Sequence, residues 1–383
     1  MEAIELNNNF RFDSKAVHFH KRLKSESTSK AQPIYQTSAF KFKNLEELEG
    51  YFEGKSPHMY SRVSNPNTED LGTGVAQLEG APNGIATSSG ISAILAGILA
   101  VAEQGSHIVA CEDLYGGTYQ LLAKELPSLG IEVSFTSFES EESIRSAMKS
   151  NTVLLYSESI TNPFLRVENI DLIVNIAEET NVYTMIDNTF ATPYLLQPYL
   201  KGVNLVAHSA TKYIGGHSDI TAGVVVGDTA LVEKARSKVM NFGSNLSPFE
   251  AWLTCRGLKT LSVRMERHTM NAQKLASFLA EHAGIEKVYF PEQASDKGNG
   301  AIVSIVLNEE IDPNHFCEKL DWIGVVPTLA GVETTVSYPI GTSHRALPAN
   351  DQERLGITKQ LIRISVGIED YQDIEDAFSK ALS

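Results

Sequence analysis

A lysine between small hydroxyl residues offers the clearest chemistry in this chain. Lys212 lies in the segment His208-Ser-Ala-Thr-Lys-Tyr-Ile-Gly-Gly-His217, directly after an apolar run that is typical of a buried strand. Its primary amine can form an imine with an aldehyde, which no other side chain can do. The loop alone is equally consistent with a surface lysine in a tight turn, so neighbouring segments must decide between the two interpretations.

Two segments before Lys212 add a carboxylate and an anion-binding site. Asp187 ends the apolar run 182–186, and the carboxyl ends of parallel strands share one ligand crevice. Ser88-Ser89-Gly90 precedes an apolar helix expected over 91–102, where hydroxyl and N–H groups favour an anion, although an ordinary serine cap fits as well. A phosphate cradle, a carboxylate and an amine in this order along the chain predict pyridoxal phosphate as the cofactor, since a carboxylate keeps its ring nitrogen cationic.

Two interpretations from other classes of protein stay open. Ser209-Ala-Thr-Lys212 matches the S-x-x-K element of serine acyl transferases, although the K-T-G and S-D-N elements that accompany it are absent from the sequence. A regulatory protein that binds the cofactor without catalysis is the other alternative. The sequence has no Walker, G-x-G-x-x-G, G-x-S-x-G or H-E-x-x-H motif.

The composition is that of a folded protein with little attraction for polyanions. The chain has 383 residues, and its 47 acidic and 32 basic residues give a formal charge of −15, so nucleic acid is not expected as a partner. The cysteines are far apart and have no histidine at zinc-ligand spacing, so no metal site is predicted. The longest apolar run, 91–102, is too short to span a bilayer, and the N-terminus lacks a signal-peptide pattern. We therefore expect a cytoplasmic protein without membrane contact.

The order of the predicted elements divides the chain into three parts. From residue 85 to about 240, helix-like and strand-like segments alternate, which predicts a mostly parallel α/β sheet. A long helical stretch over 259–282, followed by isolated strands, predicts a smaller α+β domain. We expect an N-terminal arm over 1–62, a cofactor-binding α/β domain over 63–247 and a C-terminal α+β domain over 248–383.

Further motifs are spread over most of the chain. They are Tyr60-Ser-Arg-Val-Ser-Asn-Pro66, Ser88-Ser-Gly90, Tyr115-Gly-Gly-Thr118, Asp187-Asn-Thr-Phe-Ala-Thr-Pro193, His208 to Asp219 and Leu246-Ser-Pro248. Together they resemble the Cys/Met metabolism family of pyridoxal phosphate enzymes, which includes cystathionine γ-synthase, cystathionine lyases, methionine γ-lyase and O-acetylhomoserine sulfhydrylase. The resemblance implies an aspartate aminotransferase-like architecture of fold type I, assembled as a homotetramer of two tight dimers with shared active sites.

The resemblance also implies how the cofactor is held. Lys212 would carry it as an internal aldimine, and Asp187 would pair with its ring nitrogen. The arm over 1–62 would reach into the neighbouring subunit's site. The implied phosphate-binding groups are the backbone N–H groups of Gly90 and Ile91, the hydroxyls of Ser209 and Thr211, and Tyr60 and Arg62 from the neighbouring subunit.

Four residues are implied at the substrate end of the site. Tyr115 resembles the tyrosine that stacks on the cofactor ring and takes part in proton transfer, and Asn162 would contact both the cofactor and the substrate carboxylate. Arg363 matches the arginine that binds this carboxylate bidentately, a task that suits a planar guanidinium better than lysine. Thr328 stands near Lys212 at a position that is often serine.

The implied reaction is carbon–sulfur chemistry at the γ-carbon of a sulfur amino acid or an O-acylhomoserine. Lys212 would remove the α-proton, and loss of the γ-substituent leads either to 2-oxobutyrate and ammonia or, with a thiol, to γ-replacement. We expect γ-elimination, as in cystathionine or methionine γ-lyases, with γ-replacement and then β-elimination as alternatives. Met59, Gly117 and Gln120 differ from residues common in members specific for cystathionine or methionine, so the sequence leaves the preferred substrate open.

Overall fold

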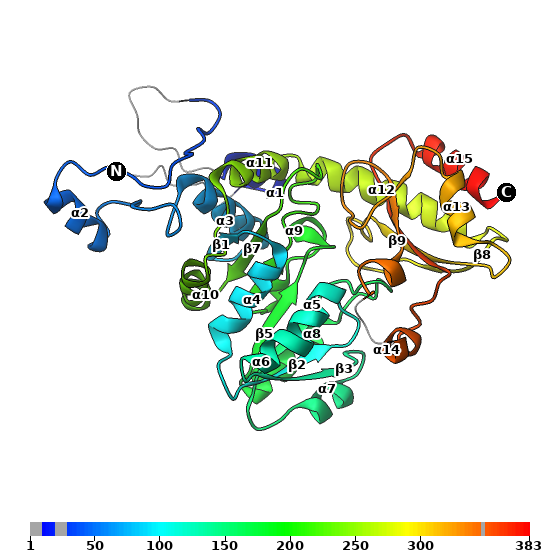
Figure 1. Cartoon of the computed structure of the whole chain (residues 1–383), viewed down its shortest axis with the longest axis horizontal. Helices are drawn as coiled ribbons and strands as arrows, with labels where there is room; N and C mark the ends of the chain where they lie inside the picture. Colours follow the sequence, from blue (N-terminus) through cyan, green and yellow to red (C-terminus); the bar gives the residue numbers. More distant parts are fainter. Residues whose placement is uncertain (1–9, 20–28, 346–348) are drawn as a thin grey trace.

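A computed structural model describes residues 10–19, 29–345 and 349–383 of the chain. These residues form two sheets, each packed against helices (Figure 1). The larger sheet lies in the N-terminal two thirds of the chain and the smaller sheet in the rest. This arrangement confirms the predicted α/β architecture with a mostly parallel sheet and a smaller C-terminal α+β unit.

The larger sheet consists of β1 (Asn83–Thr87), β2 (His107–Cys111), β3 (Glu132–Thr136), β4 (Thr152–Glu158), β5 (Tyr183–Asp187), β6 (Leu205–His208) and β7 (Gly223–Gly227). Their order in space is β1-β7-β6-β5-β4-β2-β3. The neighbours from β6 to β3 run parallel, whereas β7 is antiparallel to β6 and β1. Because β2, β6 and β7 are buried along their whole length, they are the short continuous apolar runs expected between helical layers.

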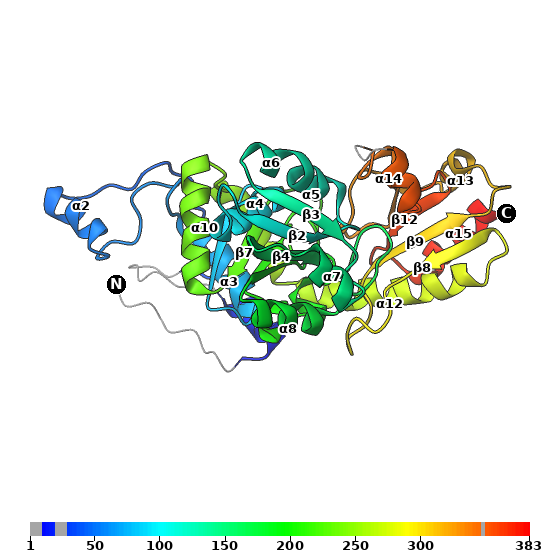
Figure 2. The same ribbon diagram turned by 90° about the horizontal axis from the view of Figure 1, so that it is seen from below.

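Helices before, between and after these strands surround the sheet. They are α3 (Pro66–Glu79), α4 (Gly90–Val101), α5 (Gly116–Gln120), α6 (Leu126–Ser128), α7 (Glu141–Ala147), α8 (Ile170–Thr180), α9 (Thr192–Leu195) and α10 (Thr229–Phe242), with a π-helical turn over Leu121–Glu125 and a 3-10 turn over Pro198–Lys201. Figure 2 shows the strands between α6 on one side and α8 on the other. Parallel strands joined through helices place all their carboxyl ends along one edge, where a ligand crevice is expected.

The smaller sheet consists of β8 (Ile285–Tyr289), β9 (Ile302–Leu307), β10 (Gly324–Val325), β11 (Thr335–Ser337) and β12 (Leu361–Ser365). Their order is β10-β11-β12-β9-β8, and the pairs from β11 to β8 are antiparallel. The accompanying elements are α13 (Pro313–Lys319), a 3-10 turn over Pro339–Gly341, α14 (Ala349–Arg354) and α15 (Tyr371–Leu382).

Two helices lead from the larger sheet to the smaller one. They are α11 (Pro248–Leu258) and α12 (Leu261–Ala280). The start of α12 buries Leu261 and Met265 in the core of the larger sheet, and its second half buries Ala272 and Leu275 in the core of the smaller one. The domain boundary at 247 stays a prediction, because α12 belongs to both cores. Neither α12 nor any other helix of the described residues has an apolar stretch long enough to cross a membrane.

The described part of the N-terminal arm contains α1 (Phe12–His18) and α2 (Leu45–Phe52). Whereas α1 packs against α3, the helix α2 stands away from the rest of the chain in both views (Figures 1 and 2). The side chains of Leu45 and Phe52 are 78% and 69% exposed. An arm that leaves large apolar side chains in solvent is a surface suited to contact with another molecule.

Buried polar groups fix α12 to the smaller sheet. His268 is fully buried, and its Nδ1–H donates to the carbonyl of Val366 over 2.7 Å. Burial, with a smaller contribution from the charge of Arg264, lowers the pKa of His268 to about 4. The neutral imidazole is therefore the form that the fold stabilises.

The free energy of unfolding should fall as the pH drops from about 6.5 to about 4, because only the unfolded chain then protonates His268. Over this interval the imidazole contributes up to about 3 kcal/mol. His268→Asn keeps a donor for Val366 but does not titrate, so denaturant unfolding at several pH values should show a shallower decline. An equally steep decline in the variant would contradict this assignment.

Candidate active site

A pocket opens at the carboxyl ends of the strands, between the larger sheet and the small domain. Its wall combines the start of α4, the ends of β4 and β5, the segment after β6 and residues of the small domain. Most of the predicted site residues line this one pocket: Gly90, Ile91, Tyr115, Asn162, Asp187, Ser209, Thr211, Lys212 and Arg363.

Lys212 reaches the pocket from the tight turn that follows β6. The turn is closed by the Lys212 N–H, which donates to the carbonyl of Ser209 over 3.0 Å. The amine donates to the hydroxyl of Thr328 over 2.7 Å, which places Thr328 where the sequence analysis expected it. Burial lowers the pKa of Lys212 to about 8, and the charge of Arg363 adds to this effect. At neutral pH a larger share of this amine is unprotonated and nucleophilic than in an exposed lysine.

Asp187 provides a buried carboxylate at the end of β5. It lies opposite Glu158 of β4 in the parallel register. Burial raises the pKa of Asp187, whereas hydrogen bonds from the N–H and hydroxyl of Thr189 and the nearby His208 lower it. Both Thr189 bonds go to Oδ1, so Oδ2 is left for a cationic partner. A pyridinium nitrogen is such a partner.

The start of α4 forms the anion-binding end of the pocket. Ser89 caps this helix by accepting the N–H of Ser92 over 3.2 Å. A Cβ at Gly90 would lie 2.6 Å from Cβ of Ser209, so only glycine lets the two segments approach this closely. Gly90, Ile91, Ser209 and Thr211 line the same pocket, which fits a phosphate group at a helix N-terminus. The hydroxyl of Thr211 donates to the carbonyl of Ala222 over 3.1 Å in this structure.

Arg363 lies on the opposite wall, on β12. Its guanidinium donates to the hydroxyl of Ser337 over 3.1 Å and to Oδ1 of Asn162 over 2.9 Å. Burial lowers the pKa of Arg363 to about 10. Among the described residues no carboxylate forms an ion pair with it, although a buried cation is normally paired. The pocket therefore offers a binding place for an anion at this end.

Two of the predicted residues do not meet this pocket within one chain. Tyr60 is 41% exposed, and the guanidinium of Arg62 lies 5.6 Å from the centre of its ring. Arg62 also donates to the carbonyl of Met240 over 3.0 Å, at the end of α10. That Tyr60 and Arg62 bind the cofactor phosphate in a neighbouring subunit's site stays a prediction.

Two buried carboxylates at the site were missed by sequence reasoning. Glu158 accepts the N–H of Tyr115 over 2.8 Å, and burial together with the charge of Asp187 raises the pKa of Glu158 well above its usual range. Behind Asp187, the buried Glu79 accepts from His208 over 2.9 Å and from Asn188 over 2.7 Å. One signal for Glu79 was present, since an acidic side chain at the last residue of a helix opposes the helix dipole.

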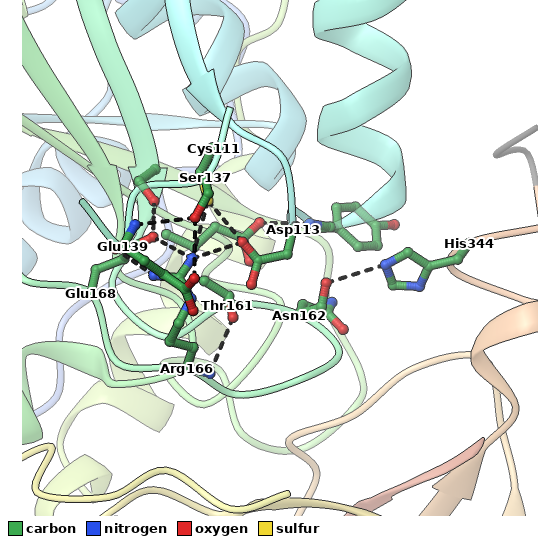
Figure 3. A network of polar contacts seen from close by, with 12 residues as sticks. Cys111, Asp113, Ser137, Glu139, Thr161, Asn162, Arg166, Glu168 and His344 are labelled. Carbon is green, nitrogen blue, oxygen red and sulfur yellow. Dashed lines mark hydrogen bonds and ion pairs between the residues drawn. The ribbon is translucent and has the colours of Figure 1, made fainter. Parts of the chain in front are cut away.

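A charged cluster supports the loops around Tyr115 and Asn162 (Figure 3). Cys111, Asp113 and Glu168 offer ligand atoms within 4.8 Å of one another, which is the spacing of a metal site. Arg166 donates to all three side chains, at 3.4 Å, 2.8 Å and 3.0 Å respectively. The guanidinium is therefore the cation of this cluster.

A buried amine, a buried carboxylate, a phosphate cradle and an unpaired guanidinium in one pocket meet the requirements of a pyridoxal phosphate enzyme that acts on amino acids. The family model of Cys/Met metabolism PLP-dependent enzymes matches residues 13–383, and the chain belongs to this family. It is thus a pyridoxal phosphate-dependent lyase or transferase of cysteine and methionine metabolism.

Relatives in this family differ in the reaction they catalyse. Cystathionine gamma-lyase of Bacillus subtilis (strain 168) is 38% identical over 361 residues, which cover 91% of this chain and 93% of the relative. Cystathionine gamma-synthase/O-acetylhomoserine (thiol)-lyase of the same organism is 37% identical over 351 residues, covering 91% of this chain and 90% of the relative. A solved Campylobacter jejuni structure that contains N'-pyridoxyl-lysine-5'-monophosphate is 27% identical, with a TM-score of 0.92 over 97% of this chain and 100% of that one.

The rate at which cofactor-stripped protein recombines with pyridoxal phosphate should rise with pH and level off above about 8, because the unprotonated Lys212 amine is the reacting form. Arg363→Met removes a positive charge that lowers the pKa of Lys212, so the midpoint should move to higher pH. Stopped-flow absorbance measures both profiles, and Arg256→Met on α11 is the control. An unchanged midpoint in Arg363→Met would contradict the coupling between the two cations.

Proposed function

We propose that this protein is a carbon–sulfur lyase that releases the γ-substituent of a sulfur amino acid by γ-elimination. The observation that carries the proposal is the buried Arg363, which has no carboxylate partner among the described residues and lines the same pocket as the Lys212 amine. An α-amino acid supplies the missing carboxylate to Arg363 and brings its α-carbon toward Lys212.

The cofactor and the substrate carboxylate are held at separate places. The start of α4 with Ser209 and Thr211 holds the phosphate, and Asp187 keeps a proton on the ring nitrogen. Arg363 and Asn162 hold the substrate carboxylate, because the guanidinium bound to Asn162 Oδ1 has further N–H groups to donate. Tyr115 borders the space between these places.

Lys212 performs the proton transfers. Bound pyridoxal phosphate takes up the electron pair left on the α-carbon. The Lys212 amine, with its pKa lowered to about 8, accepts the α-proton near neutral pH. Thr328 holds Nζ through a 2.7 Å hydrogen bond and thereby orients this amine. After it has released the α-proton, the same amine removes a proton from the β-carbon and can pass it to the departing γ-substituent, as a double bond forms between the β- and γ-carbons and the bond to the γ-substituent breaks.

γ-Replacement is the second candidate, because the chain is nearly equally identical to a γ-lyase and to a γ-synthase/thiol-lyase. Both outcomes use the same residues up to loss of the γ-substituent. They differ in whether water or a thiol completes the reaction. γ-Elimination is favoured here because it needs no binding place for a second substrate beside the residues named above.

The N-terminal arm would complete a second copy's site within a homotetramer of two dimers. Its helix α2 stands away from the chain with Leu45 and Phe52 in solvent, and Tyr60 and Arg62 lie outside the pocket of their own chain. An arginine at the partner's α4 adds a positive charge to the phosphate cradle.

The protein should release 2-oxobutyrate from methionine, homocysteine or cystathionine without an added thiol, as detected by mass spectrometry. Lys212→Ala should lower turnover by several orders of magnitude, since one amine serves cofactor attachment and proton transfer. Lys201→Ala, which removes a surface lysine paired with Asp171, is the matched control. Pyruvate alone would indicate β-elimination, and a product that requires a thiol and an O-acylhomoserine would indicate γ-replacement.

Arg62→Ala should weaken retention of pyridoxal phosphate about tenfold, because a charged phosphate contact is lost. Mixed with Lys212→Ala, it should regain part of the wild-type activity, because a hybrid dimer contains one site with both residues intact. Measuring activity after joint unfolding and refolding of the two variants tests this. Failure to regain any activity would mean that each chain completes its own site.

A further inference from the structure

One imidazole joins the small domain to two loops of the large domain. His344 is 1% exposed, and its Nε2 lies 3.3 Å from the carbonyl oxygen of Leu114 and 3.2 Å from that of Asn162 (Figure 3). Because both partners are acceptors, Nε2 carries the proton and shares it between them. The loop at Leu114 also carries Tyr115, and the loop at Asn162 carries the side chain of Asn162.

The neighbours of His344 fix this arrangement. The hydroxyl of Ser343 lies 2.9 Å from Nδ1 and donates to it, which selects the tautomer with the proton on Nε2. Gln352 of α14 donates to the backbone carbonyl of His344 over 2.9 Å. Burial lowers the pKa of His344 to about 4, so the neutral form that these contacts need is present at neutral pH.

The two loops are also joined to each other on the side away from His344. Arg166 donates to Asp113 over 2.8 Å and to Glu168 over 2.9 Å, and its carbonyl accepts the N–H of Thr161 over 2.9 Å. Figure 3 shows this cluster on one side of Asn162 and His344 on the other. The large domain therefore fixes the loops from one side, and the Nε2–H of His344 contacts both of them from the other.

The backbones meet directly beside this imidazole. A Cβ at Gly116 would lie 1.7 Å from the carbonyl oxygen of Ser343, so the chain here has no room for any other residue. Asn162 is held by the small domain at two points: its carbonyl accepts from His344, and its Oδ1 accepts from Arg363. A shift of this loop would therefore change the place where Arg363 and Asn162 meet.

We propose that His344 is a positioning residue that sets the affinity for the substrate carboxylate, by holding the backbone at Leu114 and Asn162 in place against Arg363. This inference rests on the proposed function, because it takes the carboxylate to bind at Arg363. The groups that hold the cofactor phosphate and ring nitrogen belong to α4, β5 and the turn after β6, which His344 does not contact. Loss of the imidazole should thus weaken amino acid binding more than cofactor retention, because Tyr115 and Asn162 are the only residues expected at the cofactor that lie on the loops held by His344.

The test is a titration of the holoenzyme with L-alanine, which has the carboxylate and amine but no leaving group, followed through the absorption of bound pyridoxal phosphate. His344→Leu should raise the dissociation constant about tenfold or more, because two buried carbonyls lose their donor. His344→Gln should stay within about threefold of wild type, since its amide N–H can replace Nε2–H. His315→Leu, at an exposed histidine of the same domain, is the matched control and should have no effect.

Folded, cofactor-loaded His344→Leu that binds L-alanine as tightly as wild type would overturn the proposal. So would His344→Gln as weak as His344→Leu, because the donor would then not be the decisive feature. A wild-type protein that responds to no α-amino acid would overturn the proposed function itself, and the role of His344 with it. The cofactor content and thermal midpoint of every variant are measured alongside.

A second comparison does not require removal of the imidazole. Ser343→Ala takes away the donor that fixes the tautomer, and it should raise the dissociation constant about threefold in the wild-type background. In the His344→Gln background the same change should have no effect, because no imidazole is left to orient. An equal effect in both backgrounds would mean that Ser343, which lines the pocket, acts on the ligand directly, and would contradict the proposed arrangement.

Discussion

The burial of charged groups at one edge of the large sheet is the constraint on which the site depends. Glu158 and Asp187 lie side by side at the ends of β4 and β5, and burial raises both of their pKa values. Across the pocket, burial lowers the pKa values of both Lys212 and Arg363, and neither cation forms an ion pair with a carboxylate among the described residues. Burying these unpaired charges costs free energy while the pocket is empty. Binding a dianionic phosphate, a pyridinium and a carboxylate pairs them and makes the arrangement favourable.

This constraint explains why the site needs two domains. The large sheet alone brings together Asp187, Lys212 and the start of α4, the groups proposed to hold the cofactor. Arg363, the cation proposed to bind the substrate carboxylate, lies on β12 of the small sheet, so the proposed recognition depends on how the two domains are fixed to each other. The helix α12 joins the two domains because it packs into the hydrophobic cores of both. Arg363 and His344 join the domains at the pocket itself.

Sequence patterns identified those site residues whose positions follow from the local order of strands and helices. Asp187 ends β5, and Gly90 and Lys212 lie in the segments that follow β1 and β6, so the rule for strand ends in α/β sheets places them at one edge. Arg363 and Asn162 lie 201 residues apart and were assigned only through resemblance to a family, since no periodicity brings them together. The roles of Glu79 and His344 were not predicted from the sequence. Their partners lie 129 and 230 residues away along the chain, and the contacts depend on tertiary packing.

The choice between elimination and replacement must then come from groups that act after the shared steps. Lys212, Asp187, Arg363 and the phosphate cradle serve both outcomes, so their presence does not separate a lyase from a synthase. The remaining variable is what reaches the γ-carbon, and within one chain this end of the pocket is bordered by Tyr115, which is 42% exposed. If the arm of a second copy covers Tyr115, its side chains decide whether a thiol can enter. Specificity would then lie in the arm, while the buried charges perform the chemistry common to the family.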